Sequence, residues 1–141
     1  MQSNQPCPIC DRQKNSQPIF ENEHWLVRHS AETNIVGYVL IEAKRHFLDM
    51  AEATESECRS YGEILGRVTK GIHRLVPAER VYTFTLGEVV PHFHVHVIPR
   101  TNQMPRVYRG RGILTYPLEP KADSSLIEIF SDGMAKALLK R

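Results

Sequence analysis

The stretch PHFHVHVIPR, residues 91–100, carries three histidines at alternate positions, with apolar side chains between and after them. Because successive side chains of a β-strand point to opposite faces, the pattern predicts a strand with His92, His94 and His96 on one face, about 6.6 Å apart. The apolar residues would face a hydrophobic core, and the histidine face would be open to solvent. Packing alone rarely requires such a row of imidazoles, so these side chains are the first candidates for chemistry.

Three interpretations of the histidine row are open. The side chains could be half-buried strand residues whose ring nitrogens are all hydrogen-bonded. They could form a catalytic metal site, although three successive positions on one strand face extend too far for all of them to hold one ion comfortably. They could also perform nucleophilic catalysis, because a neutral imidazole attacks phosphorus and forms a phosphoramidate that water or another acceptor resolves. The flanking histidines would then orient the middle one and donate hydrogen bonds to phosphate oxygens.

The length and composition are those of a single globular domain. The chain has 141 residues, of which 41% are hydrophobic and 24% charged, with a formal net charge of +2. This charge argues against a protein that coats nucleic acid or is strongly attracted to membranes. No apolar run approaches the roughly 20 residues of a membrane span, so we expect none. The first residues lack the features of a secretory signal and there are three cysteines, so we expect a cytoplasmic protein without a disulfide framework.

Periodicity and capping residues predict the strands and helices. Apolar patterns predict extended segments within residues 19–31, 37–46, 80–87 and 93–99. Thr54 and Glu57 form a capping-box signature at the start of an amphipathic helix that ends before Pro77. A second amphipathic helix is predicted from Asp123, and residues 101–122 should be irregular because proline and glycine interrupt them. The predicted fold class is α+β, with an antiparallel sheet of about five strands, one main helix and a C-terminal helix.

The segment from His92 to Ile98 resembles the His-φ-His-φ-His-φ-φ signature (φ, apolar) of the histidine triad (HIT) superfamily of nucleotide hydrolases and transferases. The stretch GYVLIEAKRH, residues 37–46, resembles the glycine-led strand of that family, which ends in Lys-x-His. The predicted main helix follows it at the position where the family has its own. The resemblance implies a HIT domain over residues 5–105, followed by a C-terminal extension, residues 106–141, that ends in the amphipathic helix.

The resemblance also implies an enzyme with assigned roles. His94 would attack the α-phosphate of a nucleotide phosphoramidate, dinucleoside polyphosphate or similar ester and form a covalent nucleotidyl-His94 intermediate. His96 would bond a phosphate or bridging oxygen, and His92 would position His94. The partners implied are a nucleotide and a second copy of the chain, in a homodimer whose sheets join. Two other functions stay open: a nucleotide-binding or scaffold protein with weak or lost catalysis, and a three-histidine metalloenzyme.

Three positions depart from the pattern of the family, and all three are candidates for contact with the substrate. Tyr38 stands where many members have a further histidine after the strand-opening glycine. Glu88 and Val89 replace a neutral amide and a hydroxyl that hold phosphate in many members. Ser30 stands where the family usually places an Asp or Asn for the ribose hydroxyls. A carboxylate beside a phosphate is repulsive unless it is protonated or offset by a cation.

The Cys-Pro-Ile-Cys segment provides Cys7 and Cys10, which are half of a zinc site by type and spacing. They could instead be two reduced surface cysteines, and a redox pair is less favoured because no βαβ pattern surrounds them. Resemblance to zinc-binding triad proteins and to galactose-1-phosphate uridylyltransferases implies that His46 and His92 complete a structural Zn²⁺ site. His92 would then fix the triad strand and would not act as an acid or base. The remaining histidines are expected on the surface: His24, His29 and His73.

Overall fold

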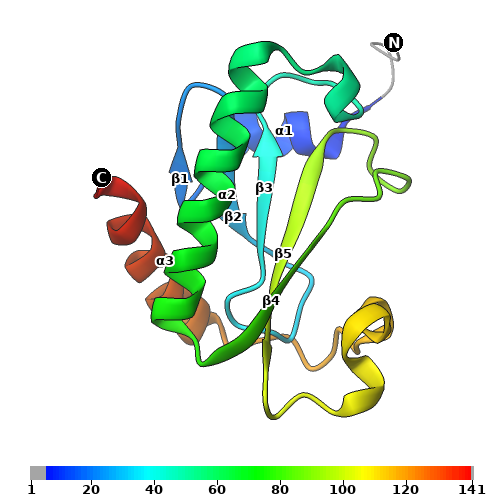
Figure 1. Cartoon of the computed structure of the whole chain (residues 1–141), viewed down its shortest axis with the longest axis vertical. Helices are drawn as coiled ribbons and strands as arrows, with labels where there is room; N and C mark the ends of the chain where they lie inside the picture. The colour runs from blue at the N-terminus through cyan, green and yellow to red at the C-terminus, as the bar shows by residue number, and fades with distance from the viewer. Residues whose placement is uncertain (1–5, 141) are drawn as a thin grey trace.

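The computed structural model describes residues 6–140 and shows a five-stranded, fully antiparallel sheet (Figure 1). The strands lie in the order β1-β2-β3-β5-β4. Their bounds are β1 Phe20–Glu21, β2 Trp25–His29, β3 Val39–Ala43, β4 Ala78–Phe84 and β5 His94–Thr101. The predicted α+β class and antiparallel sheet are therefore confirmed. Gln5, the predicted start of the domain, lies outside the described residues.

Within residues 6–140, three α-helices accompany the sheet: α1 Pro8–Asn15, α2 Glu55–Leu75 and α3 Ser124–Leu139. The predicted capping box is present at the start of α2, where the Thr54 side chain accepts from the Glu57 backbone and Glu57 accepts from the Thr54 backbone. Helix α1 was not predicted. It begins directly after Cys7, with Pro8 at its first position, a placement that costs proline no hydrogen bond.

Three short 3₁₀ helices occupy segments that lack longer periodic patterns: η1 Met50–Glu52, η2 Arg106–Tyr108 and η3 Gly110–Thr115. The last two lie within residues 101–122, which the sequence predicted to be irregular. Glycines and prolines keep this segment from forming a longer helix. It nevertheless has a regular path, because backbone bonds close its turns, for example from Arg109 N–H to the Arg106 carbonyl.

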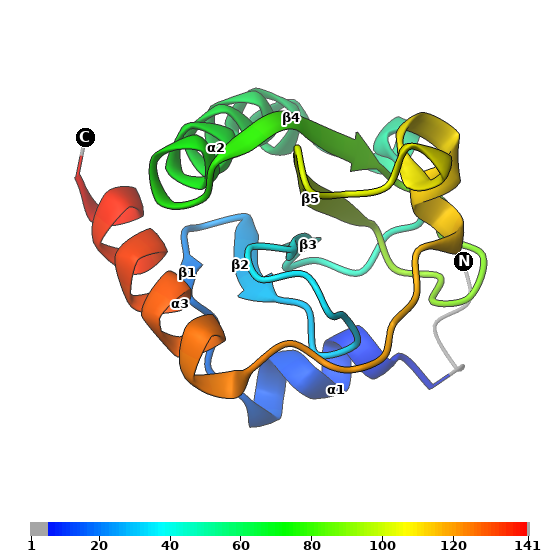
Figure 2. The same cartoon turned by 90° about the horizontal axis from the view of Figure 1, so that it is seen from below.

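The main core lies between one face of the sheet and helices α2 and α3. In both views α2 lies over this face and α3 lies beside β1 (Figures 1 and 2). Alternate strand residues supply one side of the core, including Val27, Ile41 and Val95. Both helices contribute fully buried side chains, among them Val68 and Met134. The C-terminal helix is thus part of the same hydrophobic core as the sheet.

The opposite face of the sheet carries the second and third histidines of the triad. Figure 2 shows α1 on this side, across the sheet from α2. Farther along the face, Ile98, Met104 and Ile113 form a second buried cluster, against which several aromatic side chains pack. His94 and His96 belong to β5 between these two coverings. The candidate site therefore lies on this face between α1 and the second buried cluster.

Candidate functional site

The triad does not form one straight row. Strand β5 begins at His94, so only His94 and His96 share a strand face, with ring centroids 5.0 Å apart. His92 precedes the strand, and its ring is turned toward α1. The predicted row of three on one face is therefore wrong for His92. The expectation of an open face is also wrong, because His92 is 0% exposed and His94 only 8%.

His94 is held in a defined orientation. Its Nδ1 lies 2.6 Å from the carbonyl oxygen of His92. A carbonyl only accepts, so Nδ1–H donates, and the neutral ring carries its lone pair on Nε2. The Thr85 hydroxyl donates to the His94 carbonyl at 2.6 Å and ties the loop after β4 to this residue. His94 thus has one nitrogen committed to the backbone and one available for chemistry.

His96 is packed and hydrogen-bonded on the same face. Its Nδ1 lies 2.7 Å from the hydroxyl of Tyr38, and its ring stacks on Phe84 with centroids 4.6 Å apart and planes at 10°. Burial, with a smaller effect of His94, lowers the pKa of His96 to about 4. Burial raises the pKa of Tyr38 to about 12. Both groups are therefore neutral near pH 7.

The other two predicted substrate residues lie in different surroundings. Ser30 is buried, its backbone N–H donates to the Tyr38 carbonyl at 2.8 Å, and its hydroxyl accepts from the Glu32 N–H at 3.2 Å. Glu88 is exposed on the loop between β4 and β5. In the described part of the chain, Glu88 makes no hydrogen bond or ion pair with the histidines. The structure therefore connects Ser30 and Tyr38 to the triad but not Glu88.

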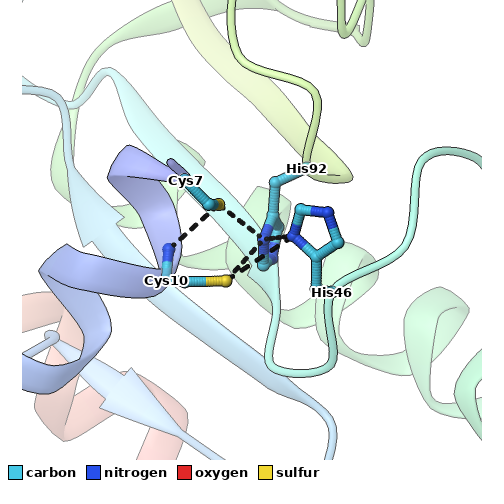
Figure 3. A group of neighbouring side chains, drawn as sticks. All are labelled: Cys7, Cys10, His46 and His92. Atoms are coloured by element: carbon cyan, nitrogen blue, oxygen red, sulfur yellow. Dashed lines mark hydrogen bonds between the residues drawn. The ribbon is translucent and has the colours of Figure 1, made fainter. Parts of the chain in front are cut away.

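The four predicted metal ligands come together (Figure 3). One ligand atom from each of Cys7, Cys10, His46 and His92 lies within 4.8 Å of the others. His92 Nδ1 is 3.3 Å from Cys7 Sγ, 3.5 Å from Cys10 Sγ and 3.1 Å from His46 Nδ1, and Cys10 Sγ is 3.6 Å from His46 Nδ1. A tetrahedral zinc ion with ordinary Zn–S and Zn–N bonds requires ligand separations of about 3.3–3.8 Å. The donor set fits that ion, and the four separations given lie within about 0.2 Å of this range.

Bonds around the cluster orient its ligands. His92 Nε2 lies 2.7 Å from the Ala43 carbonyl, to which it donates, and this leaves the Nδ1 lone pair facing the sulfurs. The Cys10 N–H donates to Cys7 Sγ at 3.2 Å as part of the first turn of α1. Burial and the neighbouring Cys7 raise the pKa of the Cys10 thiol to about 11. A bound cation would supply the charge that two adjacent thiolates need.

His92 belongs to both parts of the site. Its ring nitrogen faces the two cysteines, and its carbonyl accepts the bond from His94 Nδ1. The metal cluster and the candidate nucleophile therefore share one residue. Contacts between the cluster and the His92 ring hold the backbone of His92, and the carbonyl of that residue orients His94.

A buried carboxylate that the sequence analysis missed attaches α1 to the sheet. Glu42 is 0% exposed and pairs with Arg12 of α1 at 2.5 Å and with Arg28 of β2 at 3.2 Å. Gln13 donates to the carbonyl of Ala43 at 3.0 Å. One signal was present in the sequence: a carboxylate inside an otherwise apolar strand needs a buried cation as its partner. The pairing of Glu42 with His94 across β3 and β5 places this network beside the triad.

Replacing Glu42 by alanine should destabilise the fold by about 3–5 kcal/mol, because it leaves the buried Arg28 guanidinium without its counter-charge. Denaturant unfolding measures the change. Glu55→Ala is the matched control, since Glu55 pairs with Arg59 on the exposed surface of α2 and should cost at most about 0.5 kcal/mol. Equal stability of the two variants would show that the Glu42 network does not hold α1.

The three histidines outside the triad and the cluster differ in their burial. His73 is exposed, as predicted, and His24 is half-buried. His29 is also half-buried, but both of its ring nitrogens are hydrogen-bonded: Nδ1 donates to the Ser30 carbonyl at 2.9 Å and Nε2 accepts from the Gly37 N–H at 2.9 Å, so it is not the free surface side chain that the sequence predicted. Packing against Phe130 of α3 explains the burial. His29 therefore supports the segment that leads to Tyr38.

Comparison with known families agrees with this arrangement. The HIT domain model matches residues 11–103, about two thirds of the chain. The chain belongs to the HIT family. An uncharacterized 13.2 kDa HIT-like protein of Azospirillum brasilense is 29% identical over 100 residues, which cover 65% of this chain and 81% of the relative.

Solved structures of HIT proteins share the fold. A hypothetical histidine triad nucleotide-binding protein from Sulfolobus tokodaii aligns with a TM-score of 0.73 and 19% identity, over 94% of this chain and 92% of that one. A zinc-bound histidine triad family protein from Mycobacterium smegmatis aligns with a TM-score of 0.67 and 19% identity, over 95% and 94% of the two chains. At these identities the likeness establishes the fold of this HIT protein. Within residues 6–140, no helix has the length and apolarity to cross a membrane.

Proposed function

We propose that this HIT protein is a nucleotidyl hydrolase or transferase that works through a covalent nucleotidyl-His94 intermediate. The observation that carries the proposal is the bond from His94 Nδ1–H to the His92 carbonyl, which leaves the Nε2 lone pair as the reactive nitrogen. The substrate would be a nucleotide phosphoramidate, dinucleoside polyphosphate or similar ester. The polar groups of His96 and Tyr38 lie beside His94 on the same face.

The proposed reaction has two steps. His94 Nε2 attacks the α-phosphorus, a P–N bond forms, and the bond from phosphorus to the leaving group breaks while that group takes up a proton. A hydrogen bond donated by His96 would stabilise charge on a phosphate or bridging oxygen. Water, or another acceptor in a transferase, then attacks the phosphorus and releases one proton to solvent, which balances the proton that the leaving group took from solvent. The P–N bond breaks, the nucleotide leaves and neutral His94 is restored.

Intact-mass spectrometry after mixing with a panel of activated nucleotides tests the proposal. We expect a mass increase of one nucleotidyl group on the wild-type chain and none on His94→Asn. Fragmentation should place the group on His94. Ligand binding without an adduct or turnover, across purine and pyrimidine substrates, would indicate instead a nucleotide-binding protein that has lost catalysis.

The cysteine–histidine cluster is proposed to hold one structural Zn²⁺ through Cys7, Cys10, His46 and His92. The spacing of the four ligand atoms supports this role. Four protein ligands close the coordination shell, which is typical of structural zinc and leaves no position for a substrate. The ion would stabilise the fold by joining three distant segments. His94 and His96 are outside the cluster, so the three-histidine metalloenzyme is not favoured.

We also propose a cytoplasmic homodimer in which two β4 strands pair and join the sheets. Strand β4 is the longer of the two sheet edges, and edge strands expose unpaired backbone groups. Beside it runs a groove of about 370 Å³, and the exposed side chains of Leu86 and Leu114 line it. Sedimentation equilibrium should give about twice the 16.2 kDa of one chain. A monomer at 100 µM or more would contradict the dimer.

A further inference from the structure

We propose that Tyr38 is a positioning residue that fixes the tautomer of His96. In this arrangement the Tyr38 hydroxyl donates to His96 Nδ1, and His96 therefore carries its proton on Nε2. The histidine would act on the substrate only as a neutral donor. Contrary to the sequence prediction, Tyr38 would therefore not contact the substrate but would orient His96, which does. Its kinetic consequence rests on the proposed function.

The direction of the bond follows from the two groups. The separation of 2.7 Å between Tyr38 Oη and His96 Nδ1 requires one proton between them. The unprotonated nitrogen of a neutral imidazole is a better acceptor than a phenol oxygen, so the phenol donates. Within residues 6–140, no second acceptor lies within bonding distance of the Tyr38 hydroxyl. If His96 donated instead, the half-buried phenol proton would have no protein partner, which is unfavourable.

The backbone of Tyr38 is held firmly enough to impose this choice. Its carbonyl accepts from the Ser30 N–H, and the preceding Gly37 donates to His29 Nε2. Gly37 has φ +100°, and a Cβ there would lie 3.1 Å from Val76 and 3.2 Å from Pro99, so glycine is required. The close packing at Gly37 therefore fixes the backbone position of Tyr38.

The rings on both sides of the bond are also confined. Tyr38 packs against the second buried cluster of Ile98, Met104 and Ile113. Phe84 stacks on His96 and restricts rotation of the imidazole. Part of this support comes from residues 104–113, a segment for which the sequence analysis had no role. The segment thus touches the candidate site at Tyr38.

Of the two ring nitrogens of His96, Nε2 is the one that stays free to contact a substrate. In the described residues, Nε2 has no hydrogen-bond partner, whereas Nδ1 is occupied by the tyrosine. The free Nε2–H lies on the same sheet face as the available Nε2 of His94. His94 is thereby prepared to attack phosphorus, and His96 is prepared to donate a hydrogen bond to an oxygen of the substrate. Such preorganised donors favour a transition state in which negative charge develops on oxygen.

Tyr38→Phe tests the proposal, with Tyr82→Phe as a matched control. Phenylalanine keeps the packing and removes only the hydroxyl. Tyr82 belongs to the same cluster, but its hydroxyl accepts from the Gly110 N–H at 2.8 Å and touches no histidine. Ring-nitrogen ¹⁵N NMR, assigned with His96→Asn, should show His96 protonated on Nε2 in the wild type and in Tyr82→Phe. Tyr38→Phe should populate the other tautomer.

Kinetics supply the second readout. Loss of one neutral hydrogen bond should lower kcat about 2- to 10-fold in Tyr38→Phe with KM nearly unchanged, and Tyr82→Phe should match the wild type. A wild-type His96 protonated on Nδ1, an unchanged tautomer in Tyr38→Phe, or a rise in KM alone would overturn the proposal. If the wild type forms no nucleotidyl adduct, the proposed function fails, while the NMR result still decides the role of Tyr38.

Discussion

Replacing His94 by alanine is expected to lower kcat by about 10⁴-fold or more, the largest effect on activity that we predict. The imidazole is the only group proposed to form a bond to phosphorus, and neither neighbouring histidine offers an unprotonated nitrogen that is free to attack. His92 Nδ1 faces the cysteines, and His96 is bonded to Tyr38. Steady-state turnover of a nucleotide phosphoramidate measures the loss.

The fold of the His94→Ala variant should be retained, because the bonds that position this segment come from the backbone. The Thr85 hydroxyl bonds the His94 carbonyl, and β5 pairs with β3 and β4. His73→Ala is the control, since His73 is exposed on α2, which lies on the other face of the sheet from His94. Turnover within tenfold of the wild type by a folded His94→Ala protein would contradict the covalent mechanism.

Replacing Cys10 by serine is expected to release zinc and to lower the melting temperature by about 10 °C or more. Serine is a poor zinc ligand compared with a thiolate, and zinc binding to a site absent from the unfolded chain stabilises the fold directly. A decrease of about 3 kcal/mol in the free energy of unfolding corresponds to roughly this shift in melting temperature for a domain of this size. The cluster joins residues 7–10, 46 and 92, so loss of the metal removes a link between three segments of the fold that lie far apart in the chain.

Elemental analysis of protein purified without chelator or affinity-tag metal should find about one zinc per chain in the wild type and little in Cys10→Ser. Cys58→Ser is the control, because Cys58 is exposed on α2 and outside the cluster. Activity of Cys10→Ser should fall less than that of His94→Ala, since the bond that orients His94 ends on the His92 carbonyl and not on its ring. A metal-free wild type of full stability would show that the cysteines bind no structural ion.

Local patterns in the sequence determined much of the fold. The alternation from His94 onward predicted β5, because side-chain direction in a strand depends only on position along it. The Thr54–Glu57 capping box predicted the start of α2, because its two bonds lie within one helical turn. The resemblance to the HIT family supplied Cys7 and His46 as partners in one cluster, which lie far apart in the chain. Each of these features depends on local spacing or on a known motif.

The tertiary structure decided the features that depend on which segments meet. The ring of His92 leaves the row and faces Cys7 and Cys10 at the start of α1, and no pattern within residues 91–100 specifies that contact. The burial of Glu42 and its two arginine partners requires α1 to cover the sheet. The bond between Tyr38 and His96 joins residues 58 positions apart. Side-chain identity and spacing thus predicted which groups are candidates for chemistry, whereas long-range packing decided their orientation and protonation, because these depend on neighbours that the local sequence does not contain.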